Sequence, residues 1–382
     1  MNKRFAFSVT VAVTALLFVS VAGTAFGQVP TYDPSARAIF TTLPPHNNFP
    51  GNSAPAGAQL QQWTFNWTSS FDNRNFSSVI AGTDPSTNNS TTTVTVAVFP
   101  IKMVYGASNG NMTFDPASPY SGKYSTTQMV LDSPIFQSYF DYRQGGTDLG
   151  RTQYIDAYQR GNFAGAVKTN TNYHIILKTV LGPEQTFNVP SGEGSVIANP
   201  WSGIPTGTAD INWFDSQLQT VLSKFPQVQP NILPLFITSN VYLTEGVCCV
   251  GGYHSANGFQ PSGQTYSYST VIAQDNALQD GVFSQDISAL SHEIGEWLMD
   301  PFVDNPSPCP SNSILEIGDP LEHNATFGDY PYTIQGFTFH PQDLVFITWF
   351  GAPAATSLDR WDGKKTDVIS FQNENLAVCQ VN

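Results

Sequence analysis

Residues 291–301 read SHEIGEWLMDP, and this stretch decides how the rest of the chain is expected to fold. We expect the last turns of a helix that starts near Ser284, a favourable N-cap residue, and that stops at Pro301. At about 100° per residue, five apolar side chains share one face of this helix. They are Ile287, Leu290, Ile294, Trp297 and Leu298. The spacing therefore predicts an amphipathic helix whose apolar face packs inward.

The other face of this helix carries an imidazole and two carboxylates. His292 and Glu296 are one turn apart, so both can reach a single metal ion. Glu293 lies beside them, where a general base for a metal-bound water would sit. The pattern is the H-E-x-x-H helix of zinc proteases with a glutamate in place of the second histidine. In a chain this poor in His and Glu it arises by chance only about 0.003 times, which favours a functional site over an accidental polar face.

A third protein ligand is expected from the segment that follows the helix. Glu316 and Asp319 are the candidates, although Asp319 before Pro320 also fits a plain turn. Asp300 lies at the helix C-terminus, where a carboxylate meets the negative end of the helix dipole, so a compensating contact is expected. That contact is either a hydrogen bond that orients His292 or an ordinary turn before the proline.

The exchange of histidine for glutamate changes the charge of the expected site. One histidine and two carboxylates neutralise a divalent ion, and a neutral site acidifies its bound water less than a positive one. Hard oxygen ligands also make other ions competitive. We therefore expect zinc, with manganese, iron or calcium as alternatives.

Composition and the N-terminal residues bound the class of protein and its partners. The net charge is −14, with only 15 Lys and Arg, so nucleic acid is excluded as a partner. Residues 1–27 combine a basic start, an apolar run and small residues before Gln28, which predicts a signal peptide, with a membrane anchor as the alternative. We expect a secreted or extracellular protein, with periplasm or cell wall as further options, and no stable membrane insertion after cleavage.

The rest of the chain is expected to hold one α+β domain. Residues 28–90 are rich in Pro, Asn, Ser and Thr and predict an irregular leader, and residues 91–382 predict a mixed β-sheet packed on the active-site helix. Strands are predicted at 91–105, 173–180, 232–243, 265–273 and, as a pair, within 337–350; helices are predicted at 133–143, 152–160 and 210–225. Pro100 indicates a bulge or a sheet edge in the first of these strands. We expect His174 to be a packed structural histidine. The strand at 265–273 is expected to be an edge strand beside the active-site cleft.

The four cysteines predict two disulfides in an oxidising compartment. They are Cys248, Cys249, Cys309 and Cys379. A bond between the adjacent pair is strained. Cys309 is therefore expected to pair with Cys379 or with one of the adjacent cysteines.

Four short motifs, taken in order, resemble the EXORDIUM-like, or phosphate-induced, secreted proteins of plants and their bacterial relatives. They are Gly252-Tyr253-His254-Ser255, Thr265-Tyr266-Ser267-Tyr268, the helix stretch at 291–301, and Glu316-Ile317-Gly318-Asp319. The resemblance covers roughly residues 230–350 and implies an extracellular protein with a zincin-like core. It favours His292, Glu293, Glu296, Glu316 and Asp319 as site residues. It also implies that Tyr253 and His254 belong to the cleft, although a buried, hydrogen-bonded histidine explains His254 equally well.

Three functions from different classes are compatible with these residues. The first is a secreted metal-dependent hydrolase, peptidase-like, that acts on peptides or extracellular proteins and uses Glu293 as the base. The second is a non-catalytic extracellular or cell-wall-associated binding module with a structural metal site. The third is a glycosidase that uses paired carboxylates such as Glu293 and Glu316 without metal. Metal content separates the third from the other two, and turnover separates the first from the second.

Overall fold

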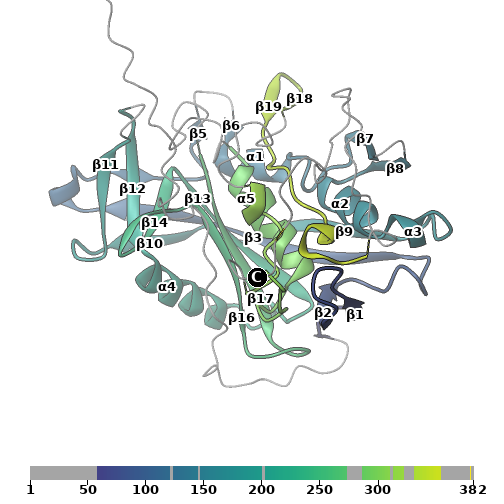
Figure 1. The fold of residues 1–382 in the computed structure, drawn as a ribbon. Helices are drawn as coiled ribbons and strands as arrows, with labels where there is room; N and C mark the ends of the chain where they lie inside the picture. Colours follow the sequence, from purple (N-terminus) through teal and green to yellow (C-terminus); the bar gives the residue numbers. More distant parts are fainter. Residues whose placement is uncertain are drawn as a thin grey trace, which may run out of the picture. The chain divides into compact units, whose positions relative to one another are not determined.

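The computed structural model describes residues 58–120, 124–144, 147–199, 203–272, 286–309, 313–321, 331–353 and 379. These residues form an α+β structure with most of its regular elements in strands, as Figure 1 shows. The predicted signal peptide at 1–27, the leader before residue 58 and Ser284 lie outside the described residues. None of the helices in the described ranges has the length and apolar character needed to cross a membrane.

A seven-stranded mixed sheet forms the centre of the fold, with the order β10-β3-β13-β17-β16, while β4 and β9 also pair with β3. Its strands are β3 (Thr91–Tyr105), β4 (Thr113–Phe114), β9 (His174–Leu181), β10 (Gln185–Val189), β13 (Ile232–Ser239), β16 (Gly252–Asn257) and β17 (Gln264–Val271). β3, β9, β10, β13 and β17 run parallel, and β16 is antiparallel to β17. The predicted strands at 91–105, 173–180 and 265–273 are confirmed to within a few residues.

Two strand predictions need correction. Pro100 lies inside β3, opposite Ile237 of β13, and its other side faces the gap between Leu181, where β9 ends, and Gln185, where β10 begins. A residue without an N–H is tolerated at such a gap in the strand pairing. The strand at 265–273 is not at the edge either, since β17 lies between β13 and β16, and β16 forms the edge.

Alternate side chains of the central sheet belong to two different cores. Leu233, Leu235 and Ile237 of β13 pack into a core that includes Ile294 of α5 (Ser288–Met299). Phe236 between them packs into a second core with Phe214 of α4 (Ile211–Lys224). This period of two is expected for a sheet covered on both faces. The helix that carries the candidate site therefore lies on one face of the sheet, and the predicted amphipathic helix at 210–225 lies on the other.

A second sheet and several hairpins complete the structure. The four-stranded sheet has the order β11-β12-β14-β15, with β11 (Gly194–Ala198), β12 (Pro205–Asp210), β14 (Val241–Glu245) and β15 (Val247–Val250). Two-stranded units are β1 (Gln62–Thr68) with β2 (Asn75–Ala81), β5 (Pro119–Tyr120) with β6 (Tyr124–Ser125), β7 (Phe140–Gln144) with β8 (Thr147–Thr152), and β18 (Tyr332–Ile334) with β19 (Phe337–Phe339). The remaining helices are α1 (Thr126–Leu131), α2 (Tyr154–Asn162) and α3 (Ala164–Val167), with short 3₁₀ turns at 107–109, 319–321 and 347–350.

Three further predictions differ from the structure in detail. The strand predicted at 232–243 is divided between β13 and β14, because Asn240 takes a positive φ of 52° between them. The helix predicted at 133–143 is wrong, since its second half is β7, whereas α2 confirms the helix at 152–160. The second strand predicted within 337–350 is a 3₁₀ turn. Each of these stretches is rich in residues that suit more than one structure, and tertiary pairing decides between them.

The predicted irregular leader contributes a regular element to the core. Residues 62–81 form the hairpin of β1 and β2, and its buried side chains Trp67, Phe76 and Ile80 belong to the same core as Ile294. The side chain of Asn305 fastens β2 to the segment after α5, because it accepts from Val79 N at 2.7 Å and donates to Val79 O at 2.7 Å. The hairpin therefore helps to hold the C-terminal end of α5.

One predicted disulfide is present. Cys309 is bonded to Cys379, with 5.5 Å between their Cα atoms, so it joins the loop after α5 to the C-terminal region. Cys249 is also disulfide-bonded. The side chain of Cys248 lies outside the described residues, so the expectation for the adjacent pair stays a prediction.

Candidate metal centre

The helix α5 places three of the predicted site residues in the interior of the protein. It begins at Ser288 rather than near Ser284, and no side chain caps its first turn. Every residue of α5 is buried, including His292, Glu293 and Glu296, which are 0–3% exposed. The polar face is therefore not a solvated face, because β16 and the segments at 316–319 and 342 cover it. Buried ionisable groups at such a density need charge partners.

The position of His292 is fixed by Gln342. The imidazole Nδ1 lies 2.9 Å from Gln342 Oε1, while Gln342 Nε2 donates to the carbonyl of Gly318 at 2.7 Å. Because a carbonyl only accepts, the orientation of the Gln342 amide is determined, and its Oε1 must accept a proton from Nδ1. His292 Nε2 therefore presents its lone pair, and the nearest carboxylate atom is Glu296 Oε1 at 3.1 Å.

His254 on β16 repeats this arrangement from the opposite side. Its Nε2 lies 3.1 Å from the backbone carbonyl of Asp300, so Nε2 carries the proton and donates it there. The lone pair of Nδ1 then faces two carboxylates, Glu293 Oε2 at 3.4 Å and Glu296 Oε2 at 3.8 Å. Two neutral imidazoles thus direct lone pairs at carboxylate oxygens.

Burial keeps both imidazoles neutral. Loss of hydration lowers the pKa of His292 to about 4 and the pKa of His254 to about 3. A neutral imidazole whose second nitrogen is held by an acceptor is the form that binds metals. Without a cation or a proton between them, each lone pair and its carboxylate oxygen would repel one another.

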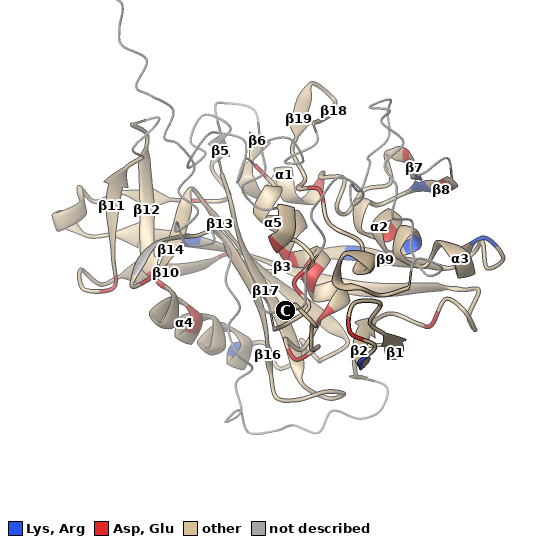
Figure 2. Cartoon of the chain, in the orientation of Figure 1, with Lys and Arg blue, Asp and Glu red and all other residues tan. Residues whose placement is uncertain are grey.

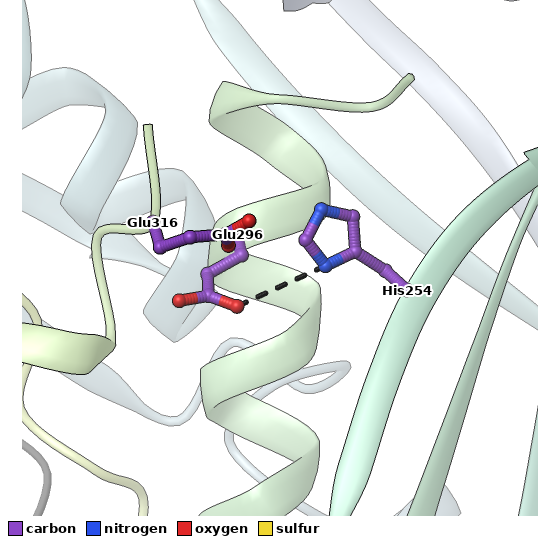
Figure 3. A group of neighbouring side chains, drawn as sticks. All are labelled: His254, Glu296 and Glu316. Atoms are coloured by element: carbon purple, nitrogen blue, oxygen red, sulfur yellow. Dashed lines mark ion pairs between the residues drawn. The ribbon is translucent and has the colours of Figure 1, made fainter. Parts of the chain in front are cut away.

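Glu316 and Asp319, the two candidates for a third ligand, both reach this cluster. Glu316 forms a group of donors with His254 and Glu296, and Figure 3 shows these three side chains converging beside α5. Asp319 Oδ1 lies 3.7 Å from His292 Nε2, and the side chain of Asp319 is 35% exposed. The backbone N–H of Gly318, between them, donates to Glu296 Oε1 at 3.1 Å. All five predicted ligand and base residues are therefore brought together, and Figure 2 shows acidic positions gathered at α5.

Two glycines make room for the site. A Cβ on Gly318 would lie 2.4 Å from Nδ1 of His292, and a Cβ on Gly252 would lie 2.6 Å from Cγ of Glu293. Real Cβ atoms do not approach that closely. The imidazole packs directly on the backbone of the segment at 316–319, and the Glu293 side chain on the backbone of β16. Gly252 and Gly318 each belong to one of the four sequence motifs. The lack of space for a Cβ explains why a glycine stands at each of these two positions.

Two supporting roles differ from the sequence-based expectation. Asp300 does not orient His292, because its carboxylate accepts from the backbone N–H groups of Asp304 and Asn305, and it is the Asp300 carbonyl that holds His254. Tyr253 is not a cleft residue, since its hydroxyl donates to Asp215 of α4 at 2.8 Å on the other face of the sheet. Neighbours in a strand point to opposite faces, so Tyr253 and His254 cannot serve one site.

Gln342 is the supporting residue that the sequence did not reveal. It lies fifty positions beyond His292 and belongs to none of the motifs. Its backbone N–H donates to Ser291 Oγ at 2.7 Å, and Tyr154 of α2 donates to its carbonyl. The only sequence signal is that Ser291 belongs to the helix motif, and that signal does not identify its partner.

The donor set fits a divalent cation. Metal–ligand distances of about 2.0–2.2 Å place neighbouring donors of a tetrahedral ion about 3.4 Å apart. The distances found, from 3.1 to 3.8 Å, surround that value. The buried imidazoles and carboxylates could therefore hold a metal ion.

Comparison with known proteins gives no match. No family model matches the chain, and no curated protein and no solved structure is significantly similar to it. The resemblance to the EXORDIUM-like proteins therefore stays a prediction that rests on the four motifs.

Proposed function

We propose that this chain is a secreted metal-dependent hydrolase, peptidase-like, with a zincin-like arrangement around α5. The observation that carries the proposal is the pair of neutral imidazoles, His254 and His292, whose lone pairs face the same group of buried carboxylates. His292 and Glu296 would hold the metal from the helix, with Asp319, Glu316 and His254 as the donors around them. A divalent ion bound here would acidify a water molecule and polarise a substrate carbonyl.

Other side chains of the site would transfer the proton and hold the ligands in position. Glu293 would accept the proton of the attacking water and deliver it to the leaving amine. Its Oε2 lies 3.4 Å from His254 Nδ1, so His254 would stabilise or orient the carboxylate during this exchange. Gln342 keeps His292 in the metal-binding tautomer, and the Gly318 N–H keeps Glu296 in place. Asp319 is the most exposed member, so water and substrate would arrive from its side.

A second function is favoured by one specific observation. His254, His292, Glu293, Glu296 and Glu316 are each at most 3% exposed. Closed coordination is typical of structural metal sites, whereas catalytic sites keep an open position. An extracellular or cell-wall-associated binding module with a structural metal is therefore the alternative, and turnover distinguishes it from the hydrolase.

The test compares two glutamates of the same helix. Glu293→Gln removes the base but keeps the size of the side chain, so metal should stay bound while hydrolysis of a broad fluorogenic peptide library falls by about a hundredfold. Glu296→Gln removes a ligand charge and should weaken metal binding itself. Glu193→Gln, in a turn before β11, is the matched control and should change neither. Absence of any turnover in metal-loaded wild type would favour the structural site, and unchanged turnover in Glu293→Gln would remove Glu293 from its role.

A further inference from the structure

The buried donors beside α5 fall into two groups rather than one. His254, Glu296 and Glu316 form the first group, and His292, Glu293 and Glu296 form the second. Within each group the ligand atoms lie within 4.8 Å of one another. Each group contains one imidazole and two carboxylates, and Glu296 is common to both. Asp319, 3.7 Å from His292 Nε2, adds a further carboxylate on the side of the second group.

The two oxygens of Glu296 face different histidines. Oε1 lies 3.1 Å from His292 Nε2, and Oε2 lies 3.8 Å from His254 Nδ1. A carboxylate that offers one oxygen to each of two ions is a bridging ligand. Ions in two-metal sites lie about 3.5–4 Å apart, a spacing that the two oxygens of one carboxylate can span. The placement of Glu296 between the histidines matches that requirement.

The charge of the cluster supports the same conclusion. When ionised, the four carboxyl groups of Glu293, Glu296, Glu316 and Asp319 carry four negative charges. One divalent ion would leave two negative charges among these groups, whereas two divalent ions would balance all four. Uncompensated charge in a buried site is costly. Two ions therefore suit the donor set better than one.

We propose that this centre is dinuclear, with Glu296 bridging one divalent ion on the side of His254 and Glu316 and a second on the side of His292 and Asp319. The inference rests on the proposed metal centre and specifies it further. Oxygen-rich sites with one imidazole per ion take manganese, iron or zinc. The supporting contacts are separate for the two halves, because the Asp300 carbonyl holds His254 and Gln342 holds His292.

Manganese binding to the full chain tests the proposal, because the electron paramagnetic resonance spectrum of Mn²⁺ distinguishes an isolated ion from two neighbouring, coupled ions. Chelator-treated protein is titrated with Mn²⁺, bound metal is counted by elemental analysis, and electron paramagnetic resonance spectra are recorded at each step. The wild type should bind two ions per chain, and an exchange-coupled spectrum should appear with the second equivalent. Saturation at one ion with the six-line signal of an isolated Mn²⁺ would overturn the proposal.

Variants locate the two ions. Glu316→Gln should reduce the count from two to one and leave an uncoupled six-line signal, while Glu193→Gln should retain two coupled ions. If Glu316→Gln does not fold, judged by circular dichroism, Glu316→Asp provides the second variant and should weaken one of the two binding steps by at least about tenfold. Two coupled ions in Glu316→Gln, or two unaltered steps in Glu316→Asp, would contradict the assignment.

Failure of this inference is distinguishable from failure of the proposed function. One bound ion together with peptide hydrolysis would reject the dinuclear centre and keep the hydrolase. Two bound ions without hydrolysis of any substrate would keep the dinuclear centre and reject the hydrolase. No bound ion would reject both.

Discussion

Gln342 Oε1 lies 2.9 Å from His292 Nδ1, and this contact determines which nitrogen of the histidine faces the carboxylates. The amide is held in turn by the Gly318 carbonyl, so His292, Gln342 and the segment at 316–319 form one unit. Partners of this kind orient metal-binding histidines and raise their basicity. The contact joins a motif residue of α5 to a residue that no motif predicts.

Replacing Gln342 should therefore weaken the metal site without touching a ligand. Gln342→Leu leaves His292 Nδ1 and the Gly318 carbonyl without this partner, so divalent metal affinity should fall by about 10–100-fold and the free energy of unfolding by about 1–3 kcal/mol. Isothermal titration calorimetry and chemical denaturation measure the two effects. Gln217→Leu on α4, far along the chain from the site, is the control; equal metal affinity in both variants would argue against the role of Gln342.

Gly318 should not tolerate a methyl group. In Gly318→Ala the new Cβ would lie 2.4 Å from His292 Nδ1, so the imidazole or the segment at 316–319 must move. We expect a loss of stability of about 1–3 kcal/mol and a large loss of metal affinity. Gly192→Ala is the matched control, because nothing lies within 4 Å of the added atom. Normal metal binding by Gly318→Ala would show that the close packing on His292 is not required.

The two buried histidines predict how acid affects the metal-free protein. Their pKa values in the folded chain are about 4 for His292 and about 3 for His254, whereas a histidine in the unfolded chain titrates near pH 6.5, at about its ordinary value. Between about pH 6.5 and these lower values, the two histidines bind more protons in the unfolded chain than in the folded chain. Their contribution to the free energy of unfolding is therefore fully present above about pH 6.5 and is lost as the pH falls below it. Asp300 acts with opposite sign, since burial raises its pKa well above the ordinary value and its contribution is lost as pH rises.

Comparison with His254→Asn isolates the effect of one histidine. The free energy of unfolding of chelator-treated protein is measured by denaturation between pH 3 and pH 8, and the pH dependence of the variant should be weaker than that of the wild type. His174→Asn is the control, because His174 lies on β9 beside Asp156 and outside the metal cluster. Identical pH profiles for wild type and His254→Asn would contradict the burial argument.

Tyr253 should matter for stability and not for metal binding. Its hydroxyl and that of Tyr266 both donate to Asp215 Oδ1 at 2.8 Å, on the face of the sheet that α4 covers. Tyr253→Phe should lower the free energy of unfolding by about 1–3 kcal/mol, because a buried carboxylate loses a donor. Metal affinity should be unchanged within error, and a loss of tenfold or more would restore Tyr253 to the site.

Sequence alone was sufficient where periodicity or a motif was strong. The strand at 91–105, the helices at 152–160 and 210–225, and the cluster of His292, Glu293, Glu296, Glu316 and Asp319 follow from local pattern. The helix motif did not predict that its polar face is covered, although His292, Glu293 and Glu296 are all buried. Polar residues on a helix indicate solvent in most proteins, and only the fold shows which of them are buried.

The remaining parts depend on contacts between distant segments. Gln342 and the Asp300 carbonyl act through hydrogen bonds to histidines 50 and 46 positions away, which no local pattern encodes. The hairpin at 62–81 was not predicted, because the composition of residues 28–90 is typical of irregular segments. Trp67, Phe76 and Ile80 alternate with polar residues along its strands, and their side chains face the core. The opposite directions of Tyr253 and His254 follow from strand geometry once β16 is recognised as a strand.

Metal content of the full chain, purified without chelators and then exposed to zinc or manganese, decides whether α5 carries a metal centre. We expect at least one divalent ion bound per wild-type chain, its loss in Glu296→Gln, and its retention in Glu193→Gln. A wild type that retains no divalent ion, or a Glu296→Gln variant that retains as much as the wild type, would contradict the metal centre at α5.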